Sequence, residues 1–272
     1  MLRRARFADD MWYPSSPERL RGDVEGYIAG GGGAAPALGL ISPHAGYFYS
    51  GPVAGKGYAA VEVTPTVIVL APPHRRAGAA VSVWSGGPWR TPLGEVGIDK
   101  ELRAVVLDRC DAAALDDTAH SDEHSLELQL PFLQVRRADV RIVPVAVATR
   151  DVTVLKSLGD ACAEAARSAP GGSALIVASS DMNHFESESV TKRKDGLALE
   201  RACELDPEGM LEVVERESIS MCGAAPAAAM LYAARELGAS EAEVVAHGSS
   251  ADASGDTTRV VGYAAVVVRP PS

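Results

Sequence analysis

The segment from Thr66 to His74, T-V-I-V-L-A-P-P-H, restricts the fold of this chain more than any other stretch. The run from Val67 to Ala71 is apolar and carries no charge, which is typical of a strand buried on both faces of a parallel sheet. Pro72 and Pro73 stiffen the path by which the chain leaves that strand, because proline fixes its own φ and restricts the residue before it. We therefore expect His74 just beyond the carboxyl end of a buried strand.

Two further segments repeat this arrangement. The run from Leu38 to Ile41 leads into His44, and the run from Ala174 to Ala178 leads into Asp181, which His184 follows. In open α/β sheets, ligands bind in the crevice beyond the carboxyl ends of the strands. The sequence therefore predicts that three histidines and an aspartate meet in one crevice, provided that their strands are neighbours in one sheet.

Composition narrows the class of protein. The formal net charge of -10 argues against a nucleic-acid partner, because phosphate binding needs clustered Lys and Arg. No stretch approaches the roughly 18 apolar residues that a membrane span requires. The four cysteines, Cys110, Cys162, Cys203 and Cys222, form no C-x-x-C pair, so we expect a reducing, cytoplasmic environment without disulfides.

We expect a single α/β domain over residues 1–272, in which residues 1–36 form an N-terminal arm, a helix and a glycine-rich linker. Further helices are predicted at 52–60, 99–110, 152–168, 188–204, 207–217 and 224–237. Further strands are predicted at 81–84, 243–246 and 260–268, with an edge hairpin at 89–96. The strand at 141–148 contains Pro144, which places it near a sheet edge or a bulge. A first helical turn at 121–124 puts His124 and Glu127 on one helix face.

The histidines at the strand ends suggest a metal site. Imidazole binds first-row divalent metals, and two histidines with one anionic ligand leave coordination positions open for a substrate or O₂. His44 and His74 are candidates, and Asp181, Glu127 and Cys222 are alternatives for the anionic third ligand. Cys222 begins a predicted helix, where backbone N–H groups and the helix dipole favour a thiolate.

Proton transfer would require a further side chain in the same crevice. His184 is a candidate general base, oriented by the nearby carboxylate of Asp181. His124 is a candidate proton donor or binder of an anionic substrate. His120 and His247 lie in predicted loops and receive no role.

Seven short motifs, in this order along the chain, resemble the Memo family. That family includes the human mediator of ErbB2-driven cell motility and the bacterial and archaeal AmmeMemoRadiSam system protein B. The motifs are Pro43-His44-Ala45-Gly46-Tyr47, Pro73-His74, Arg90-Thr91-Pro92-Leu93-Gly94, Glu123-His124-Ser125-Leu126-Glu127, Ser179-Ser180-Asp181-Met182-Asn183-His184, Met221-Cys222-Gly223 and Val261-Gly262-Tyr263-Ala264-Ala265. The resemblance runs from about residue 3 to residue 268.

The resemblance implies a three-layer α/β/α sandwich with a mixed, largely parallel sheet, similar to class III extradiol dioxygenases of the LigB type. By position, His44 and His74 match the two metal histidines of the family, and Cys222 matches its cysteine ligand. Asp181 and His184 match the remaining pocket residues, and His184 stands where those dioxygenases keep their base. His124 is similar to their second pocket histidine.

One difference from the ring-cleaving enzymes bears on the metal. They have a glutamate at the position of Cys222, and a thiolate is softer, favours copper(I) or zinc, and can itself be oxidised. We therefore expect a mononuclear Fe(II) or copper oxidoreductase that acts with O₂ on a catechol-like small molecule. A zinc-dependent hydrolase with the same ligands is a weaker alternative. The alternative is a non-catalytic module that binds a metal, a peptide or a small anion. The resemblance also implies an AMMECR1-like protein and a radical SAM enzyme as partners.

Overall fold

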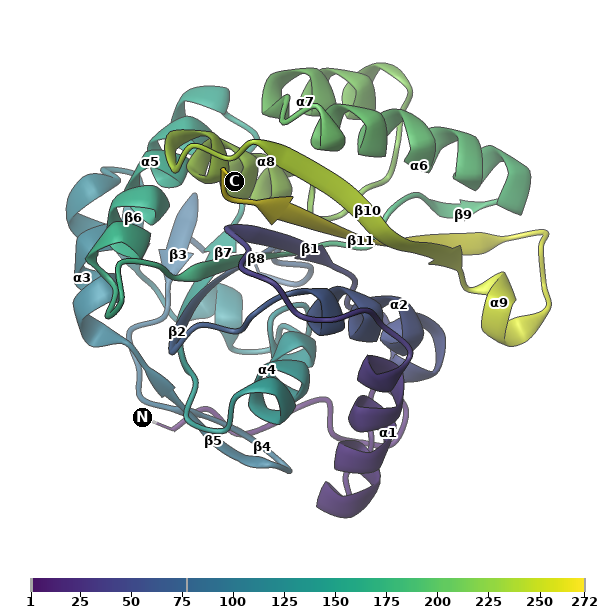
Figure 1. Cartoon of the computed structure of the whole chain (residues 1–272), viewed down its shortest axis with the longest axis horizontal. Coiled ribbons are helices and arrows are strands. Elements are labelled where there is room, and N and C mark those ends of the chain that lie inside the picture. Colours follow the sequence, from purple (N-terminus) through teal and green to yellow (C-terminus); the bar gives the residue numbers. More distant parts are fainter. Residues whose placement is uncertain (1, 77, 272) are drawn as a thin grey trace.

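The computed structural model describes residues 2–76 and 78–271, in which helices and strands alternate along the chain (Figure 1). The elements are α1 (Pro17–Ala29), β1 (Gly39–Ser42), α2 (Tyr47–Ala60), β2 (Thr66–Ala71), β3 (Val81–Val83), β4 (Trp89–Thr91), β5 (Gly94–Ile98), α3 (Lys100–Arg109), β6 (Ala113–Leu115), η1 (Thr118–His120), η2 (Glu127–Gln129), α4 (Leu130–Arg136), β7 (Arg141–Val147), α5 (Val152–Ser168), β8 (Leu175–Ser179), β9 (His184–Glu186), α6 (Glu188–Cys203), α7 (Pro207–Arg216), α8 (Ala224–Glu236), β10 (Glu241–Ser249), α9 (Ala251–Ser254) and β11 (Val260–Arg269).

Acidic or hydroxyl side chains begin several of the predicted helices. Ser16 accepts a hydrogen bond from the N–H of Arg19, and Pro17 occupies the first turn of α1. Asp99 and Asp151 cap α3 and α5 in the same way. Such caps satisfy N–H groups that have no partner inside the helix, which is why these helices begin where the sequence predicts.

The central strands of the sheet are parallel, and antiparallel strands extend it on both sides. The order is β10-β11-β1-β8-β2-β7-β3-β6. The strands β1, β8, β2 and β7 run parallel to one another, so that Ile41 lies opposite Ala178, and Ala178 lies opposite Leu70. Antiparallel pairs join β11 to β1, β10 to β11 and β3 to β7. This confirms the predicted mixed, largely parallel sheet.

Helices cover both faces of the sheet and complete the α/β/α sandwich (Figure 1). On one face α1, α2 and α4 enclose an apolar cluster that includes Leu40 and Val69. On the other face α3, α5 and α8, with α6 and α7 beside them, enclose a cluster that includes Ile41 and Ile68. The β strands alternate their side chains between these clusters, which explains why β2 is apolar throughout. No helix in the described ranges has the length and apolar composition to cross a membrane.

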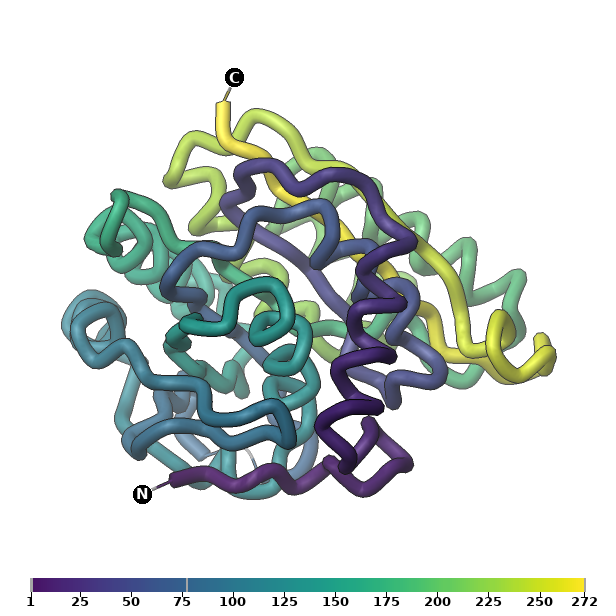
Figure 2. The backbone as a smooth tube through the Cα atoms, turned by 60° about the horizontal axis from the view of Figure 1, so that its bottom comes forward, coloured from purple at the N-terminus to yellow at the C-terminus, as the bar shows by residue number. Residues whose placement is uncertain are grey.

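The N-terminal arm, residues 2–16, runs alongside the hairpin of β4 and β5 before the chain enters α1 (Figure 2). Arg3 forms an isolated parallel bridge with Trp89, and its guanidinium carbon lies 3.8 Å from the centroid of the Trp89 ring. This arm reaches the edge of the sheet where the candidate residues gather.

The prediction that the strand with Pro144 lies near an edge or a bulge is wrong, because β7 lies inside the sheet. It pairs with β2 on one side. On its other side β3 pairs with residues 145–147 and β5 pairs with residues 141 and 142. Pro144 falls between these two partners, where the ladder is interrupted and the N–H that proline lacks is not required.

The predicted helical turn at 121–124 is also wrong. The N–H groups of His124 and Ser125 donate to Oε1 of Glu123, each at 2.9 Å, instead of to a helical ladder. Regular structure resumes only at η2, which starts at Glu127. His124 and Glu127 therefore do not share the face of one helix.

Candidate metal centre

Three neighbouring parallel strands bring the predicted residues to one edge of the sheet. His44 follows β1, Asp181 follows β8, and His74 follows β2, and these strands are adjacent in the order β1-β8-β2. Because parallel strands end at the same edge, their carboxyl ends form one crevice. The three strands are therefore neighbours in one sheet, which was the condition for these side chains to meet in one crevice.

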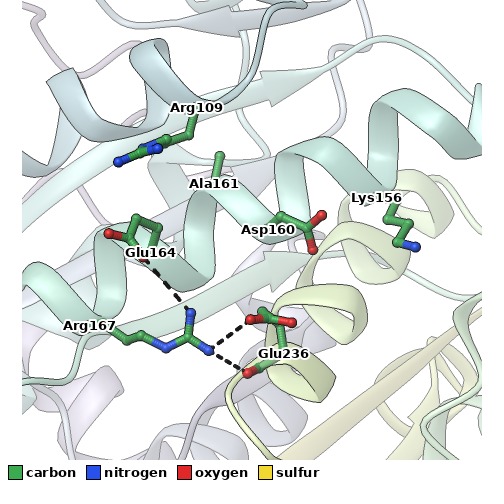
Figure 3. Close-up of a pocket in the computed structure, with 7 residues that line it drawn as sticks. All are labelled: Arg109, Lys156, Asp160, Ala161, Glu164, Arg167 and Glu236. Carbon is green, nitrogen blue, oxygen red and sulfur yellow. Dashed lines mark hydrogen bonds and ion pairs between the residues drawn. The ribbon is translucent and has the colours of Figure 1, made fainter.

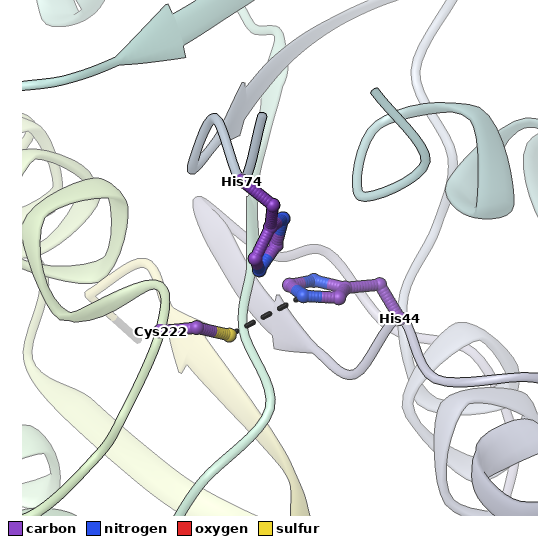
Figure 4. Close-up of side chains that lie close together, drawn as sticks. All are labelled: His44, His74 and Cys222. Atoms are coloured by element: carbon purple, nitrogen blue, oxygen red, sulfur yellow. Dashed lines mark hydrogen bonds between the residues drawn. The ribbon is translucent and has the colours of Figure 1, made fainter. Parts of the chain in front are cut away.

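One ligand atom each of His44, His74 and Cys222 lies within 4.8 Å of the other two (Figure 4). Sγ of Cys222 is 3.3 Å from Nε2 of His44, and the two imidazole centroids are 5.2 Å apart. His44 is buried, Cys222 is half-buried and His74 is exposed. The three side chains therefore leave an approach from solvent on the side of His74.

The hydrogen bonds around Ser179 determine which nitrogen of His44 carries its proton. The hydroxyl of Ser179 donates to the carbonyl of Ser125 at 2.6 Å and accepts from Nε2 of Gln129 at 2.8 Å. Its one proton is thus in use, so at 2.8 Å from Nδ1 of His44 it acts as an acceptor. His44 then carries its proton on Nδ1 and directs the lone pair of Nε2 towards Cys222.

Glu123 likewise determines which ring nitrogen of His74 carries the proton. Its Oε1 lies 2.9 Å from Nδ1 of His74, and its Oε2 accepts the backbone N–H of the same residue. A proton on Nδ1 of His74 leaves Nε2 unprotonated, which is the form that binds metals. Burial alone raises the pKa of Glu123, but the close approach of the His124 and His74 imidazoles outweighs it and holds the pKa well below its usual range.

The sequence assigned no role to Glu123 and offered Glu127 as one of three alternatives for the anionic ligand. Glu127 lies outside the centre and holds the N-terminal arm: its carboxylate accepts from Nη1 of Arg3 at 2.6 Å and from the Tyr13 hydroxyl at 2.7 Å. It also accepts the backbone N–H groups of Arg6 and Phe7. No local feature of the sequence distinguished Glu123 from Glu127, since both lie close to His124.

Asp181 supports the centre through the backbone. Its Oδ1 accepts the N–H of His44 at 2.7 Å and that of Ala45 at 3.3 Å, and its own N–H donates to Sγ of Cys222 at 3.3 Å. Burial raises the pKa of this carboxyl group, and the hydrogen bond from the N–H of His44 opposes that rise. Asp181 does not hydrogen-bond to His184, so the expectation that it orients this imidazole is wrong.

Burial keeps two of the three donors, the imidazole of His44 and the thiol of Cys222, neutral. Burial raises the pKa of the Cys222 thiol, and the charge of Asp181 raises it further. Burial lowers the pKa of His44 well below its usual range, and the neighbouring histidines 124 and 74 add to the effect. A cation that replaced the thiol proton would therefore meet two imidazole nitrogens and one thiolate, a donor set that fits a soft or borderline metal ion.

Two more histidines border the same crevice. The centroid of the His124 ring lies 4.6 Å from that of His74, and Trp12 covers its far side at 4.3 Å. Nδ1 of His124 is 3.0 Å from Oε1 of Glu123 but outside hydrogen-bonding geometry. The backbone N–H of His184 donates to Ser220 Oγ at 2.7 Å, while its buried Nδ1 has no partner in the described part of the chain.

The two remaining histidines lie apart from the centre. His120 is buried, and its Nε2 lies 2.9 Å from the carbonyl of Ser82. His247 pairs with the fully buried Asp195 at 2.9 Å. These contacts account for the positions of both histidines, so neither needs a role in the chemistry.

A groove of about 540 Å³ lies on α5 and is lined by none of the residues of the centre (Figure 3). Its lining contains three basic and three acidic side chains, and Arg167 pairs with Glu236 at 3.0 Å and with Glu164 at 4.0 Å. The charges of this groove thus balance within it.

Comparison with known proteins gives one consistent result. The family model described as "Memo-like protein" matches residues 3–267. A MEMO1 family protein of Methanopyrus kandleri is 41% identical over 272 residues, covering 95% of this chain and 96% of the relative. MEMO1 family proteins of Ignicoccus hospitalis and Methanocaldococcus jannaschii are 44% and 36% identical, covering 85% and 95% of this chain and 82% and 96% of the relatives.

Proposed function

This chain belongs to the family of Memo-like proteins, and on that premise we propose that His44, His74 and Cys222 bind a single metal ion for an O₂-dependent oxidoreductase reaction. The ion would be Fe(II) or copper, with zinc as a further possibility that the thiolate allows. The observation that supports this most is the orientation of the donors: Ser179 and Glu123 hold the Nδ1 atoms of the two histidines, so that both Nε2 atoms are left as acceptors.

His44, His74 and Cys222 would hold the ion with three protein ligands, and the ion would supply coordination positions for O₂ and a catechol-like substrate. The chain itself would provide acid and base groups. His184 has an unpartnered, buried Nδ1 and would accept a proton from the substrate. His124, which packs against Trp12 and lies close to His74, would orient the substrate or donate a proton.

The first experiment measures metal content. Protein purified without oxygen is expected to contain one equivalent of metal per chain, and the His74→Ala variant to contain little. His247→Gln is the matched control, since it removes a histidine outside the centre and keeps a donor towards Asp195. Full metal content in His74→Ala would contradict the proposal.

The second experiment tests the reaction. Oxygen uptake is followed over a panel of catechols with metal-loaded protein and with His184→Gln. We expect uptake that the His184→Gln variant loses while it keeps its metal. Tight binding of metal with no uptake on any catechol would instead favour the non-catalytic binding module.

A further inference from the structure

The candidate base His184 is held by Ser220 and not by Asp181. The backbone N–H of His184 donates to Oγ of Ser220 at 2.7 Å. Within the part of the chain that the structure describes, the buried Nδ1 of the His184 imidazole has no hydrogen-bond partner. Where this ring lies therefore depends on how the main chain of His184 is held.

Ser220 belongs to a segment that runs antiparallel to the segment of His184. Three hydrogen bonds join the two segments, and their partners are Ser180 with Gly223 at 3.0 Å, Asp181 with Cys222 at 3.3 Å, and Asn183 with Ser220 at 3.1 Å. We refer to residues 180–184 and 220–223 as the paired segments. One of them carries the candidate base, and the other carries the sulfur of the candidate centre. The contacts between them therefore determine how these two groups lie relative to each other.

Asn183 is fully buried, and its side-chain amide can face in only one direction. Its Nδ2 donates to the Glu186 carboxylate at 2.7 Å, and its Oδ1 accepts the backbone N–H of Ser220 at 3.1 Å. An ionised carboxylate only accepts and an N–H only donates, so a reversed amide would lose both hydrogen bonds. The Ser220 hydroxyl accepts from the N–H of His184, so its own proton is available to Oδ1 of Asn183 at 3.2 Å. Asn183 thereby fixes the hydroxyl that holds His184.

The main chain on either side of His184 is held as well. The N–H of Asn183 donates to the fully buried Asp195 at 2.9 Å, and the carbonyl of Asn183 accepts the N–H of Gly262 at 2.8 Å. Phe185 has a φ of 63°, a left-handed conformation that is an outlier for a residue with a bulky side chain. Such a conformation persists only where the surrounding structure fixes it, and it is concentrated at functional sites. The contacts around His184 therefore hold its main chain in a conformation that local preferences oppose.

We propose that Ser220 is a positioning residue for His184. Its hydroxyl, fixed by Asn183, holds the main chain of the base at a set place relative to Cys222. This inference rests on the proposed function for the reaction that His184 serves. The positioning itself requires neither substrate nor metal, and it is tested separately.

The first test observes the His184 ring by NMR in the metal-free protein with isotope-labelled histidine. The spectrum of His184→Gln identifies the His184 signal, which we expect to be single and sharp in wild type. Ser220→Ala removes the hydroxyl and should broaden or split that signal. Ser220→Thr keeps a hydroxyl and should restore the wild-type signal. Ser220 is exposed, so we expect the fold to accept both substitutions.

Ser189→Ala is the matched control, because this exposed hydroxyl contacts Ser187 and lies outside the paired segments. It should leave the His184 signal unchanged. A sharp signal at its wild-type position in Ser220→Ala would overturn the proposal. A signal that stays broadened in Ser220→Thr would do the same, because the hydroxyl would then not be the group that holds His184.

The second test measures oxygen uptake by metal-loaded protein with a catechol that wild type oxidises. We expect Ser220→Ala to lower kcat by about tenfold with little change in KM, because a displaced base slows proton transfer without altering substrate binding. Its metal content should equal that of wild type, and Ser220→Thr should recover kcat. An unchanged kcat in Ser220→Ala would overturn the positioning role. If wild type oxidises no catechol, the proposed reaction is refuted, and the NMR signal alone decides whether Ser220 positions His184.

Discussion

The carboxylate of Glu123 lies 2.9 Å from Nδ1 of His74, although 49 positions separate the two residues in the chain. Through this contact Glu123 determines which nitrogen of His74 is left to face the other two donors. Ser179 has the same relationship to His44, 135 positions away. The centre is therefore organised as much by the residues behind the imidazoles as by the imidazoles themselves.

Replacing Glu123 should weaken metal binding without removing a ligand. In Glu123→Gln the side chain keeps its size but is a weaker acceptor for Nδ1 of His74, so we expect affinity for zinc to fall by about 10- to 100-fold. Competition with a chromogenic chelator measures this affinity. Asp122→Asn is the matched control, because its carboxylate pairs with Arg75 at the surface. Equal affinities in Glu123→Gln and wild type would contradict this role.

The contact between Arg3 and Glu127 should be important for stability, since both side chains are almost fully buried. Removing the charge of Glu127 leaves that of Arg3 buried without an opposite charge, so Glu127→Gln should lower the free energy of unfolding by about 3–5 kcal/mol. Urea denaturation of the metal-free protein measures this change. Glu208→Gln breaks an exposed pair with Arg235 and should cost less than about 1 kcal/mol. A similarly small effect in Glu127→Gln would show that the arm is not held by this pair.

Acid should destabilise the fold through His120. Burial lowers the pKa of His120 to about 4, from about 6.5 in the unfolded chain. Between these two values the unfolded state binds the extra proton and the folded state does not, so stability falls as the pH decreases from about 6.5 to about 4. The shift amounts to roughly 3 kcal/mol, and no further loss from this group is expected below about pH 4.

The His120→Gln variant isolates that contribution. Glutamine retains a donor that can reach the carbonyl of Ser82 but does not titrate. Urea midpoints of the metal-free protein, measured from pH 7 to pH 4, should therefore decline less steeply in the variant than in wild type. Parallel curves would contradict the assignment.

Gly223 is expected to tolerate no side chain. A Cβ at this position would lie 2.3 Å from the carbonyl oxygen of Ser179 and 2.5 Å from Cβ of Ser180, so either β8 or the segment with Cys222 must move. Gly223→Ala should lower the free energy of unfolding by at least about 2 kcal/mol and weaken metal binding. Gly196→Ala is the control, because a Cβ there meets nothing within 4 Å inside α6, and it should stabilise by about 0.5–1 kcal/mol. Thermal unfolding and the chelator assay distinguish the two variants.

Much of the fold could be predicted from local patterns. An apolar run followed by breakers defines a buried strand wherever it occurs, so β1, β2 and β8 and the residues just after them follow from the sequence alone. Capping residues such as Asp99 and Asp151 likewise mark helix starts without reference to the rest of the molecule. These signals depend on neighbours within a few positions.

Other features depend on residues that lie far apart in the chain, and only the tertiary structure decided them. The sequence contains two acids, Glu123 and Glu127, close to His124, and nothing local distinguishes them. Glu127 binds the N-terminal arm because Arg3, 124 positions away in the chain, packs against it. Glu123 is thereby left to bind His74. Pro144 is accommodated inside the sheet only because β3 and β5 stop on either side of it.

The sequence by itself determined that His44, His74 and Asp181 each stand at the end of a buried strand. The tertiary structure decided that these strands are neighbours, in the order β1-β8-β2, and that Cys222 meets them from the start of α8. The physical reason is that hydrophobic patterning specifies which segments become strands, whereas strand order depends on how connections and helices pack across the whole sheet.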